Sequence, residues 1–210
     1  MSALQPLLAE IRACRHCVEQ PKGAPLPHAP RPVLQASRTA RLLVAGQAPG
    51  TRVHASGRPF TDPSGERLRD WMGIGHETFY DASRVAVVPM GFCFPGLDAQ
   101  GGDRPPRSEC AWLWRVRVMA ALPRVELVLA IGLYAQKWHL GAPARPSMTE
   151  TVRAWRAGFE QTPRVLPLPH PSWRNNAWLK RNPWFADELL PVLRSEVARL
   201  VHPPKRKVHG

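Results

Sequence analysis

The sequence predicts an α/β protein, built as a three-layer α/β/α arrangement around a central, mainly parallel sheet of four strands. Four short apolar runs alternate with segments that carry helical periodicity or helix-end signals, which is typical of parallel strands joined by helical crossovers. Several runs stop at a turn rich in glycine and proline, as buried strands do where they deliver a loop to the edge of a sheet. The predicted strands are 41–45, 84–88, 127–131 and 164–169.

Two helices are predicted from clear end signals or a clear apolar face. Residues 2–12 place their leucines and Ile11 on one face. Residues 62–72 begin with Asp62 as a candidate cap, carry Pro63 at the first helical position and end at Gly73. Further helices are expected over 108–121, 134–140, around 150–156 and over 183–200. The proline-rich segment 21–32, the short segment 51–56 and the segment 91–107 are expected to be loops.

The length and composition favour one globular domain. A chain of 210 residues with 44% hydrophobic residues can bury a full core, and we expect that domain to span residues 1–201. Residues 202–210 form a basic tail that we expect to be mobile. This tail could touch phosphates, and an inert basic terminus is an equally open interpretation.

The charge balance favours a polyanion as partner. Lysine and arginine number 29 against 16 acidic residues, a formal net charge of +13 that is spread along the chain. Such a field attracts nucleic acid, because binding to phosphates releases condensed counterions whatever the base sequence. The alternative is a protein that is simply basic, since charge alone identifies no ligand.

No apolar stretch is long enough to cross a bilayer, and the N-terminus lacks the pattern of a signal peptide. We therefore expect a cytoplasmic monomer without a membrane partner. The four cysteines are too few for a secreted disulfide framework and would be free as thiolate ligands in a reducing compartment. Cys14 and Cys17 form a C-x-x-C pair, and Cys93 and Cys110 lie far downstream. Their chemistry suits either zinc or an iron–sulfur cluster, and unrelated buried thiols are the third alternative.

Three short motifs carry the functional information. Residues 46–50 read Gly-Gln-Ala-Pro-Gly, residues 57–60 read Gly-Arg-Pro-Phe, and residues 170–172 read His-Pro-Ser. The first and third follow predicted strands, so both should face one crevice at the edge of the sheet. In this order, and with the matching cysteines, the motifs resemble those of the uracil-DNA glycosylase superfamily, and among its branches the iron–sulfur, family 4/5-like bacterial enzymes. The resemblance runs from about Cys14 to Phe185.

The resemblance implies a cofactor and an activity. It favours a [4Fe-4S] cluster on Cys14, Cys17, Cys93 and Cys110 over zinc, with a structural role. It implies a monofunctional DNA glycosylase that hydrolyses the N-glycosidic bond of deoxyuridine and leaves an abasic site, with uracil-containing DNA as partner. Two alternatives stay open: a non-catalytic DNA-binding or damage-sensing protein on the same fold, or a glycosylase for another deaminated base such as hypoxanthine.

The resemblance also assigns roles around the flipped base. It places Gly46 and Phe60 against the base, with Phe60 as the stacking aromatic, and it makes His170 the donor that stabilises the departing anion. A core phenylalanine ahead of a helix is the alternative for Phe60. A rigid turn residue between two prolines is the alternative for His170.

Gln47 and Pro89 depart from the pattern of the closest branch. Gln47 stands where that branch has a water-activating carboxylate, and an amide can only orient the water. Asp62 is the replacement suggested by another iron–sulfur branch, with helix capping as the equally open alternative. His54 is a second candidate base, with an exposed loop histidine as the favoured alternative.

Pro89 replaces the asparagine that would read the uracil edge, so we expect backbone groups around Met90 and Gly91 to read the base instead. The segment 51–56 does not match the histidine-containing insertion of the covalent uracil-trapping branch. Irreversible capture is therefore not expected.

The segment after His170 suits contact with DNA. Ser172, Trp173, Arg174 and Asn175 combine an aromatic ring with a cation and polar groups, as in a loop that enters the duplex and contacts phosphates. Ser172 could hold this loop or bind a phosphate oxygen. Trp178 and Trp184 lie beside the predicted closing helix and are expected in the core.

Overall fold

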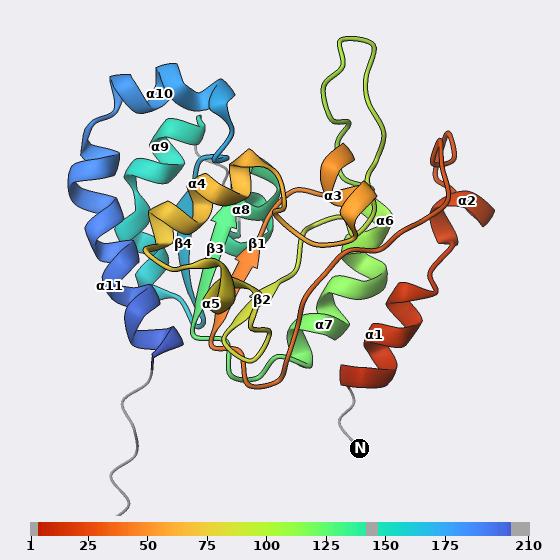
Figure 1. Ribbon diagram of the computed structural model, residues 1–210, viewed down its shortest axis with the longest axis horizontal. Coiled ribbons are helices and arrows are strands. Elements are labelled where there is room, and N and C mark those ends of the chain that lie inside the picture. The colour runs from red at the N-terminus through yellow and green to blue at the C-terminus, as the bar shows by residue number, and fades with distance from the viewer. Residues whose placement is uncertain (1–3, 142–146, 203–210) are drawn as a thin grey trace, which may run out of the picture.

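The computed structural model describes residues 4–141 and 147–202. Four strands form the central sheet: β1 (Leu42–Ala45), β2 (Val85–Val87), β3 (Leu127–Ile131) and β4 (Arg164–Leu168). They lie in the order β2-β1-β3-β4, and every pairing is parallel (Figure 1). The predicted fold class is confirmed, and each strand agrees with its prediction to within one residue at either end.

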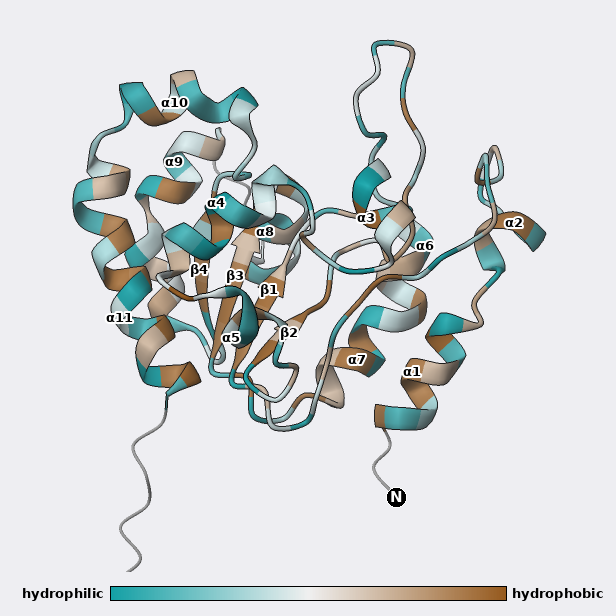
Figure 2. Ribbon diagram, in the orientation of Figure 1, coloured by the Kyte–Doolittle hydropathy of each residue, from teal (hydrophilic) through white to brown (hydrophobic). Residues whose placement is uncertain are grey.

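Side chains of each strand alternate between two buried layers. Leu42 and Val44 of β1 face one layer, whereas Leu43 and Ala45 face the other, and all four are completely buried. Burial on both faces explains why the strands read as continuous apolar runs, since a parallel sheet is covered by helices on each side. Figure 2 shows the strands as brown ribbons and the outer helices as mixtures of brown and teal.

Helices of the first layer pack on Leu42 and Val44, and those of the second layer pack on Leu43 and Ala45. The first layer contains α4 (Pro63–Met72), α5 (His76–Tyr80), α9 (Met148–Arg153), the 3-10 helix η2 (Trp155–Glu160), α10 (Asn176–Arg181), the π-helix η4 (Phe185–Leu189) and α11 (Leu190–Val201). The second layer contains α1 (Leu4–Arg12), α6 (Ser108–Cys110), the π-helix η1 (Ala111–Arg115), α7 (Val116–Ala120) and α8 (Gly132–Leu140).

Several predicted elements differ from the structure. The segment expected as a loop is helix α3 (Thr51–Ser56), which starts after Gly50 and ends at Gly57 in the left-handed conformation. α2 (His16–Glu19), α5 and α10 were also not predicted, because four to six residues are too few to show helical periodicity. The predicted helix over 108–121 is one run of α6, η1 and α7.

Two predictions extend beyond the described residues. The start of the first helix at residue 2 and the mobile basic tail after residue 202 both lie outside them. Within the described part of the chain, no helix has both the length and the apolar character needed to cross a bilayer.

The strand order places a crevice between β1 and β3, where the connections leave in opposite directions along the sheet. The chain passes from β1 to β2 on one side and later to β3 on the other, so β1 and β3 are neighbours whose connections diverge. Ligands of open α/β sheets bind outside the carboxyl ends of the strands at such a point. The loops that follow β1, β2 and β4 all begin at this edge.

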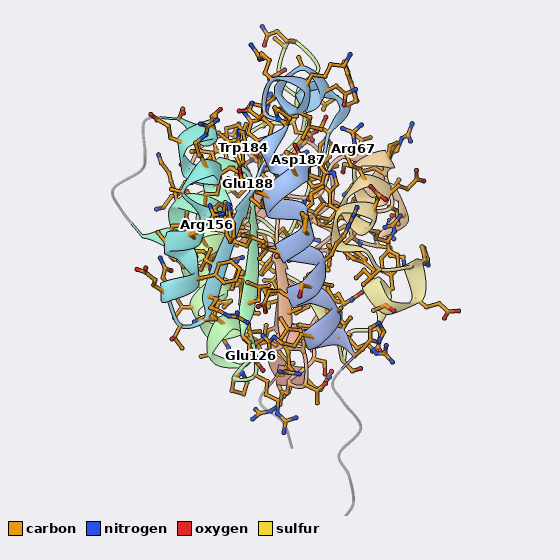
Figure 3. All side chains as sticks on the ribbon, turned by 90° about the vertical axis from the view of Figure 1, so that its left-hand side faces the viewer. Arg67, Glu126, Arg156, Trp184, Asp187 and Glu188 are labelled. Atoms are coloured by element: carbon orange, nitrogen blue, oxygen red, sulfur yellow. The ribbon has the colours of Figure 1, made fainter. Side chains whose placement is uncertain are left out.

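The opposite edge of the sheet is tied to α11 by ion pairs. Arg164 donates to both carboxylate oxygens of Glu196, at 3.0 and 2.7 Å. Arg199 bridges Glu196 and Glu126, and Arg41 donates to Glu126 at 2.6 Å. Hydrogen bonds from Arg164 lower the pKa of Glu196, and those from Arg41 lower the pKa of Glu126. Figure 3 shows Glu126 near the lower end of the sheet, well away from Arg156 and Glu188.

Substituting Glu196→Gln is expected to lower the free energy of unfolding by about 1 kcal/mol at neutral pH, because the pair with Arg164 is bidentate and mostly shielded. Because the pKa of Glu196 is lower in the folded than in the unfolded protein, its ion pair stabilises the fold at pH values above the usual glutamate pKa of about 4.3. This stabilisation is lost as the pH falls through the pKa that Glu196 has in the folded protein. The difference in melting temperature between wild type and variant should therefore shrink in acid.

Glu188→Gln is the matched control for this substitution. Glu188 pairs with Arg156 at 3.3 Å, and their side chains are 52% and 67% exposed, so its loss should not be measurable. Thermal unfolding from pH 3 to 8 checks both variants. Equal effects of the two substitutions at neutral pH would contradict the assignment.

Candidate active site

Two connected cavities lie at the carboxyl edge of the sheet. The outer cleft has a volume of 790 Å³, and the inner recess has a volume of 80 Å³. The inner recess is bounded by Gly46, Pro59, Phe60, Val87 and Pro89, among others. Both cavities are lined by Gln47, Asp62, Asp103 and His170. The outer cleft therefore leads to a recess at which three of the predicted catalytic side chains meet.

The loop after β1 is held by the loop after β2. The amide of Met90 donates to the carbonyl of Gly46 at 2.8 Å, and the amide of Gly91 donates to that of Gln47 at 2.9 Å. Of the backbone groups expected to read the base, the amides of Met90 and Gly91 are thus occupied within the protein. Pro89 is the residue of this loop that lines the recess. The Gln47 side chain faces both cavities and makes a long contact, 3.4 Å, from Nε2 to the carbonyl of Arg104.

A buried cation lies behind Pro89. Arg115 is 0% exposed, and its Nη1 donates to the carbonyls of Val88 and Pro89 at 2.9 Å each. Its Nη2 contacts Nε2 of His139. Burial lowers the pKa of Arg115 to about 9 and, with the nearby guanidinium, lowers that of His139 to about 3. The carbonyl of Pro89 is therefore already hydrogen-bonded within the protein.

Phe60 forms a wall of the inner recess in an unusual backbone conformation. Its φ is 53°, a left-handed value that costs a non-glycine residue about 1–2 kcal/mol. The Tyr80 hydroxyl and Arg69 hold its carbonyl at 3.0 and 3.2 Å. A side chain at Gly65 would meet the same carbonyl at 1.9 Å, and one at Gly46 would meet the Phe60 ring at 3.4 Å. The local structure therefore fixes the ring beside the β1 loop.

His170 follows β4 and is held by its own loop. The Asn175 side chain donates to the His170 carbonyl at 2.7 Å, and Arg67 of α4 donates to the carbonyl of Ser172 at 3.1 Å. Burial lowers the pKa of His170, and Asp62 and Asp103 oppose this shift in part. The imidazole is therefore neutral near neutral pH, with one N–H available as a donor.

Asp62 occupies the position before α4, but its side chain does not cap the helix. Its carboxylate accepts a hydrogen bond from the Ser64 hydroxyl, whose Oγ lies 2.9 and 2.8 Å from the two oxygens. It lines both cavities. The alternative role of Asp62, as a side-chain cap of α4, is therefore not observed.

Asp103 is the residue of the site that sequence reasoning missed. It lies on a hairpin in which Leu97 and Asp103 form an antiparallel bridge, and this segment rises above the sheet beside α3 in Figure 1. The segment was expected only as a long loop, and neither its spacing nor the resemblance pointed to this acid. The surrounding protein raises the pKa of Asp103, whereas Arg174 and His170 act to lower it.

The arrangement of these loops agrees with a comparison of the chain with known families. A family model, the Uracil DNA glycosylase superfamily, matches residues 34–194. The chain belongs to this superfamily. The matched segment contains all four strands, the three motifs and Asp103, and it begins after Cys14 and Cys17. Membership in the uracil DNA glycosylase superfamily implies hydrolysis of an N-glycosidic bond and DNA as the partner.

His54 lies outside the two cavities of this superfamily member. α3 directs it toward His28, whose ring centre is 4.2 Å away, and toward Phe94 at 5.9 Å. Burial, followed by the charges of His28 and Arg31, lowers the pKa of His54. The structure therefore does not bring this second candidate base to the recess.

The predicted DNA-contacting residues line the outer cleft. Trp173, Arg174 and Asn175 form the 3-10 helix η3 (Trp173–Asn175), which Ser172 caps by accepting the amide of Arg174 at 3.2 Å. Trp173 is 72% exposed, the largest exposure among the large apolar side chains described. Arg52 and Arg67 add further cations to the same cleft. Trp178 is 8% exposed, which confirms its place in the core, and Trp184 is partly buried against that core.

The four cysteines line one apolar cavity together with Ile11, Pro30, Pro32, Phe92 and Trp114. None of the four is joined in a disulfide. Cys17 and Cys110 share a hydrogen bond, and burial raises the pKa of Cys93 to about 12. Among the described residues, no group of three or more His, Cys, Asp or Glu side chains is arranged to hold a single metal ion.

Proposed function

We propose that this protein is a monofunctional DNA glycosylase that hydrolyses the N-glycosidic bond of deoxyuridine in DNA. One observation carries the proposal: a small recess walled by Phe60 and His170, with carboxylates at its mouth, opens from a cleft rimmed by arginines. Membership in the superfamily supports it. A recess of this kind suits a base that has been rotated out of the duplex.

The geometry supports a division of roles in the reaction. The extruded base stacks on Phe60, and the neutral His170 donates a hydrogen bond to the oxygen on which negative charge grows. As the bond between C1′ and the base breaks, its electron pair leaves with the base and the sugar becomes cationic. A water oxygen, oriented by Gln47, then bonds to C1′ and loses a proton. The products are the free base and an abasic site.

Hydrolysis rather than lyase chemistry follows from the residues at hand. A bifunctional enzyme needs an amine to form a Schiff base with C1′. Among the described residues that line the two cavities, none is a lysine. Water is therefore the nucleophile that this site supports.

The outer cleft supports contact with the duplex. Trp173 is exposed at the rim and suits the space left by the extruded nucleotide, with Arg174 beside its ring at 5.9 Å. The cleft arginines and the net charge of +13 suit phosphate contacts on either side of the target base.

We further infer that Cys14, Cys17, Cys93 and Cys110 hold a [4Fe-4S] cluster. Four thiols converge on one largely apolar cavity, which fits four-thiolate ligation. They come from the segment between α1 and α2, from α2, from the loop after β2 and from α6. Four thiolates also suit a zinc ion, and the resemblance of the motifs to the iron–sulfur branches is what favours the cluster. When bound, the cluster supplies cross-links between these segments and no chemistry at C1′.

Protein purified without oxygen is expected to contain about four irons and to be brown. Each Cys→Ser substitution at the four positions should lower the iron content and the melting temperature together, because the cluster joins segments that are distant in the sequence. Iron and zinc analysis checks this expectation. Stoichiometric zinc, or folded protein without metal, would overturn the cluster assignment.

The proposed function is tested by single-turnover excision on matched oligonucleotides that carry uracil, hypoxanthine or no lesion. We expect release of uracil and an alkali-labile abasic site, with no strand cleavage before alkali. Preferential release of hypoxanthine would correct the substrate, since the β2 side of the recess carries Pro89 rather than a side-chain amide. Tight binding without release of any base would favour the damage-sensing alternative.

A further inference from the structure

We propose that Asp103 is the general base of this site, accepting a proton from the water that attacks C1′. This inference rests on the proposed glycosylase function. It assigns a residue to the removal of a proton from the attacking water, which Gln47 cannot carry out. An amide can orient a water molecule, but it cannot take up the proton that the water must lose.

The position of Asp103 carries the inference first. Its side chain lines both the outer cleft and the inner recess, as do Gln47 and His170. An atom added as Cβ at Gly50 would lie 3.3 Å from Oδ2 of Asp103, so the carboxylate lies directly against the loop that follows β1. The resemblance implies a carboxylate in the loop after β1, at the position of Gln47. Asp103 brings a carboxylate to that loop from a different segment of the chain.

The hairpin that carries Asp103 is well ordered by its own hydrogen bonds. The amide of Asp98 donates to the carbonyl of Gly102 at 2.8 Å, and the Asp98 carboxylate accepts the amide of Gly102 at 2.7 Å. The amide of Arg104 donates to the carbonyl of Gly96 at 3.0 Å, with Gly96 at a φ of 92°. The two sides of the hairpin are therefore joined on either side of Asp103, which holds the backbone that carries it.

The carboxylate of Asp103 is available to a water molecule. No side-chain or backbone donor among the described residues hydrogen-bonds to it, whereas the Ser64 hydroxyl occupies the carboxylate of Asp62. Solvent reaches Asp103 through the open cleft. Of the two acids at the recess, Asp103 is therefore the one without a described donor, whereas the Ser64 hydroxyl takes one acceptor site of Asp62.

The charges around Asp103 suit a base. The groups that act on it are Arg174 and His170, which favour the carboxylate, and Asp62 and Asp98, which disfavour it. Although the residue is exposed overall, partial loss of hydration of its carboxylate is the largest influence and raises the pKa of Asp103 above its ordinary value. A raised pKa makes a carboxylate a stronger base while His170 and Arg174 remain beside it.

The proposed step balances without a further reactant. The water oxygen forms its bond to C1′ while the bond from C1′ to the base breaks and its electron pair leaves with the base. One water proton passes to an oxygen of Asp103. That proton is then released to solvent or to the departing base anion, which restores the carboxylate.

The test compares Asp103→Asn with Asp62→Asn in single-turnover excision of uracil from pH 4 to 9. Asp81→Asn serves as the reference, because Asp81 follows α5, pairs with Arg84 and lines neither cavity. Asp103→Asn should lower the rate about a hundredfold or more and remove the fall in rate on the acid side. Its melting temperature should stay within the range of Asp81→Asn. Its DNA affinity should equal or exceed that of wild type, because one negative charge has left a cleft that receives phosphates.

The outcomes separate this inference from the function on which it rests. A near-normal rate for Asp103→Asn in an active wild-type background overturns the inference alone, and a large loss confined to Asp62→Asn transfers the role to that residue. A wild-type protein that releases no base overturns both the function and the inference. An Asp103→Asn variant that loses DNA binding or thermal stability in proportion to its rate would show a structural role and also overturn it.

Discussion

Replacing His170 with alanine is expected to slow single-turnover excision of uracil by about a hundredfold to a thousandfold. A preorganised donor aimed at developing charge is worth that much when the site excludes water. His170 suits this role because burial lowers its pKa and its loop is held by Asn175 and Arg67. DNA affinity should change little, since the charge to which His170 responds appears only as the bond breaks.

His54→Ala is the matched control for this substitution. His54 is the other histidine near the first two motifs, but its ring packs on His28 and lies outside both cavities. We expect its variant to excise uracil at close to the wild-type rate. Equal losses in the two variants, or a near-normal rate for His170→Ala, would contradict the assignment of His170 as the donor to the leaving base.

Replacing Phe60 with alanine is the second substitution with a large expected effect. Stacking of a base on an aromatic ring contributes about 1–3 kcal/mol, which corresponds to a loss in rate of about fivefold to a hundredfold or more. The ring is fixed beside Gly46 in the inner recess, so its removal leaves one face of the base without a partner. Single-turnover rates with saturating enzyme check this prediction.

Phe60→Gly separates stacking from backbone strain. Glycine accepts the φ of 53° without penalty, whereas alanine does not. If stacking is the cause, both variants should lose rate to the same extent, and the glycine variant should be the more stable of the two on thermal unfolding. A glycine variant with wild-type activity would show that the ring serves the fold rather than the base.

On the side next to β2, the inner recess has no side-chain amide that could contact the edge of uracil. Pro89 replaces an amide, its carbonyl is held by Arg115, and the amides of Met90 and Gly91 are held by the β1 loop. We therefore expect polar groups on the remaining walls, notably those of Gln47 and Ser64, to distinguish one base from another. The comparison of uracil with hypoxanthine is for this reason the most informative measurement of specificity.

The sequence by itself determined the sheet, its parallel connections and the loops that carry Gln47, Phe60 and His170. These features depend on local patterns, because a strand buried on both faces is a continuous apolar run and its end is marked by glycine and proline. The match to the superfamily rests on the same segments. The core position of Trp178 was predicted in the same way, from its place beside the closing helix.

Only the tertiary structure decided which acid and which histidine face the recess. Asp103 reaches Gly50 because a hairpin folds back across some fifty residues of sequence, and no local pattern records that contact. His54 stands between two motifs in the sequence, yet one turn of α3 directs its ring toward His28. The amides of Met90 and Gly91 are likewise consumed by a neighbouring loop. Hydrogen-bond partners and side-chain directions depend on how distant segments pack, and that information is not contained in any short stretch of the chain.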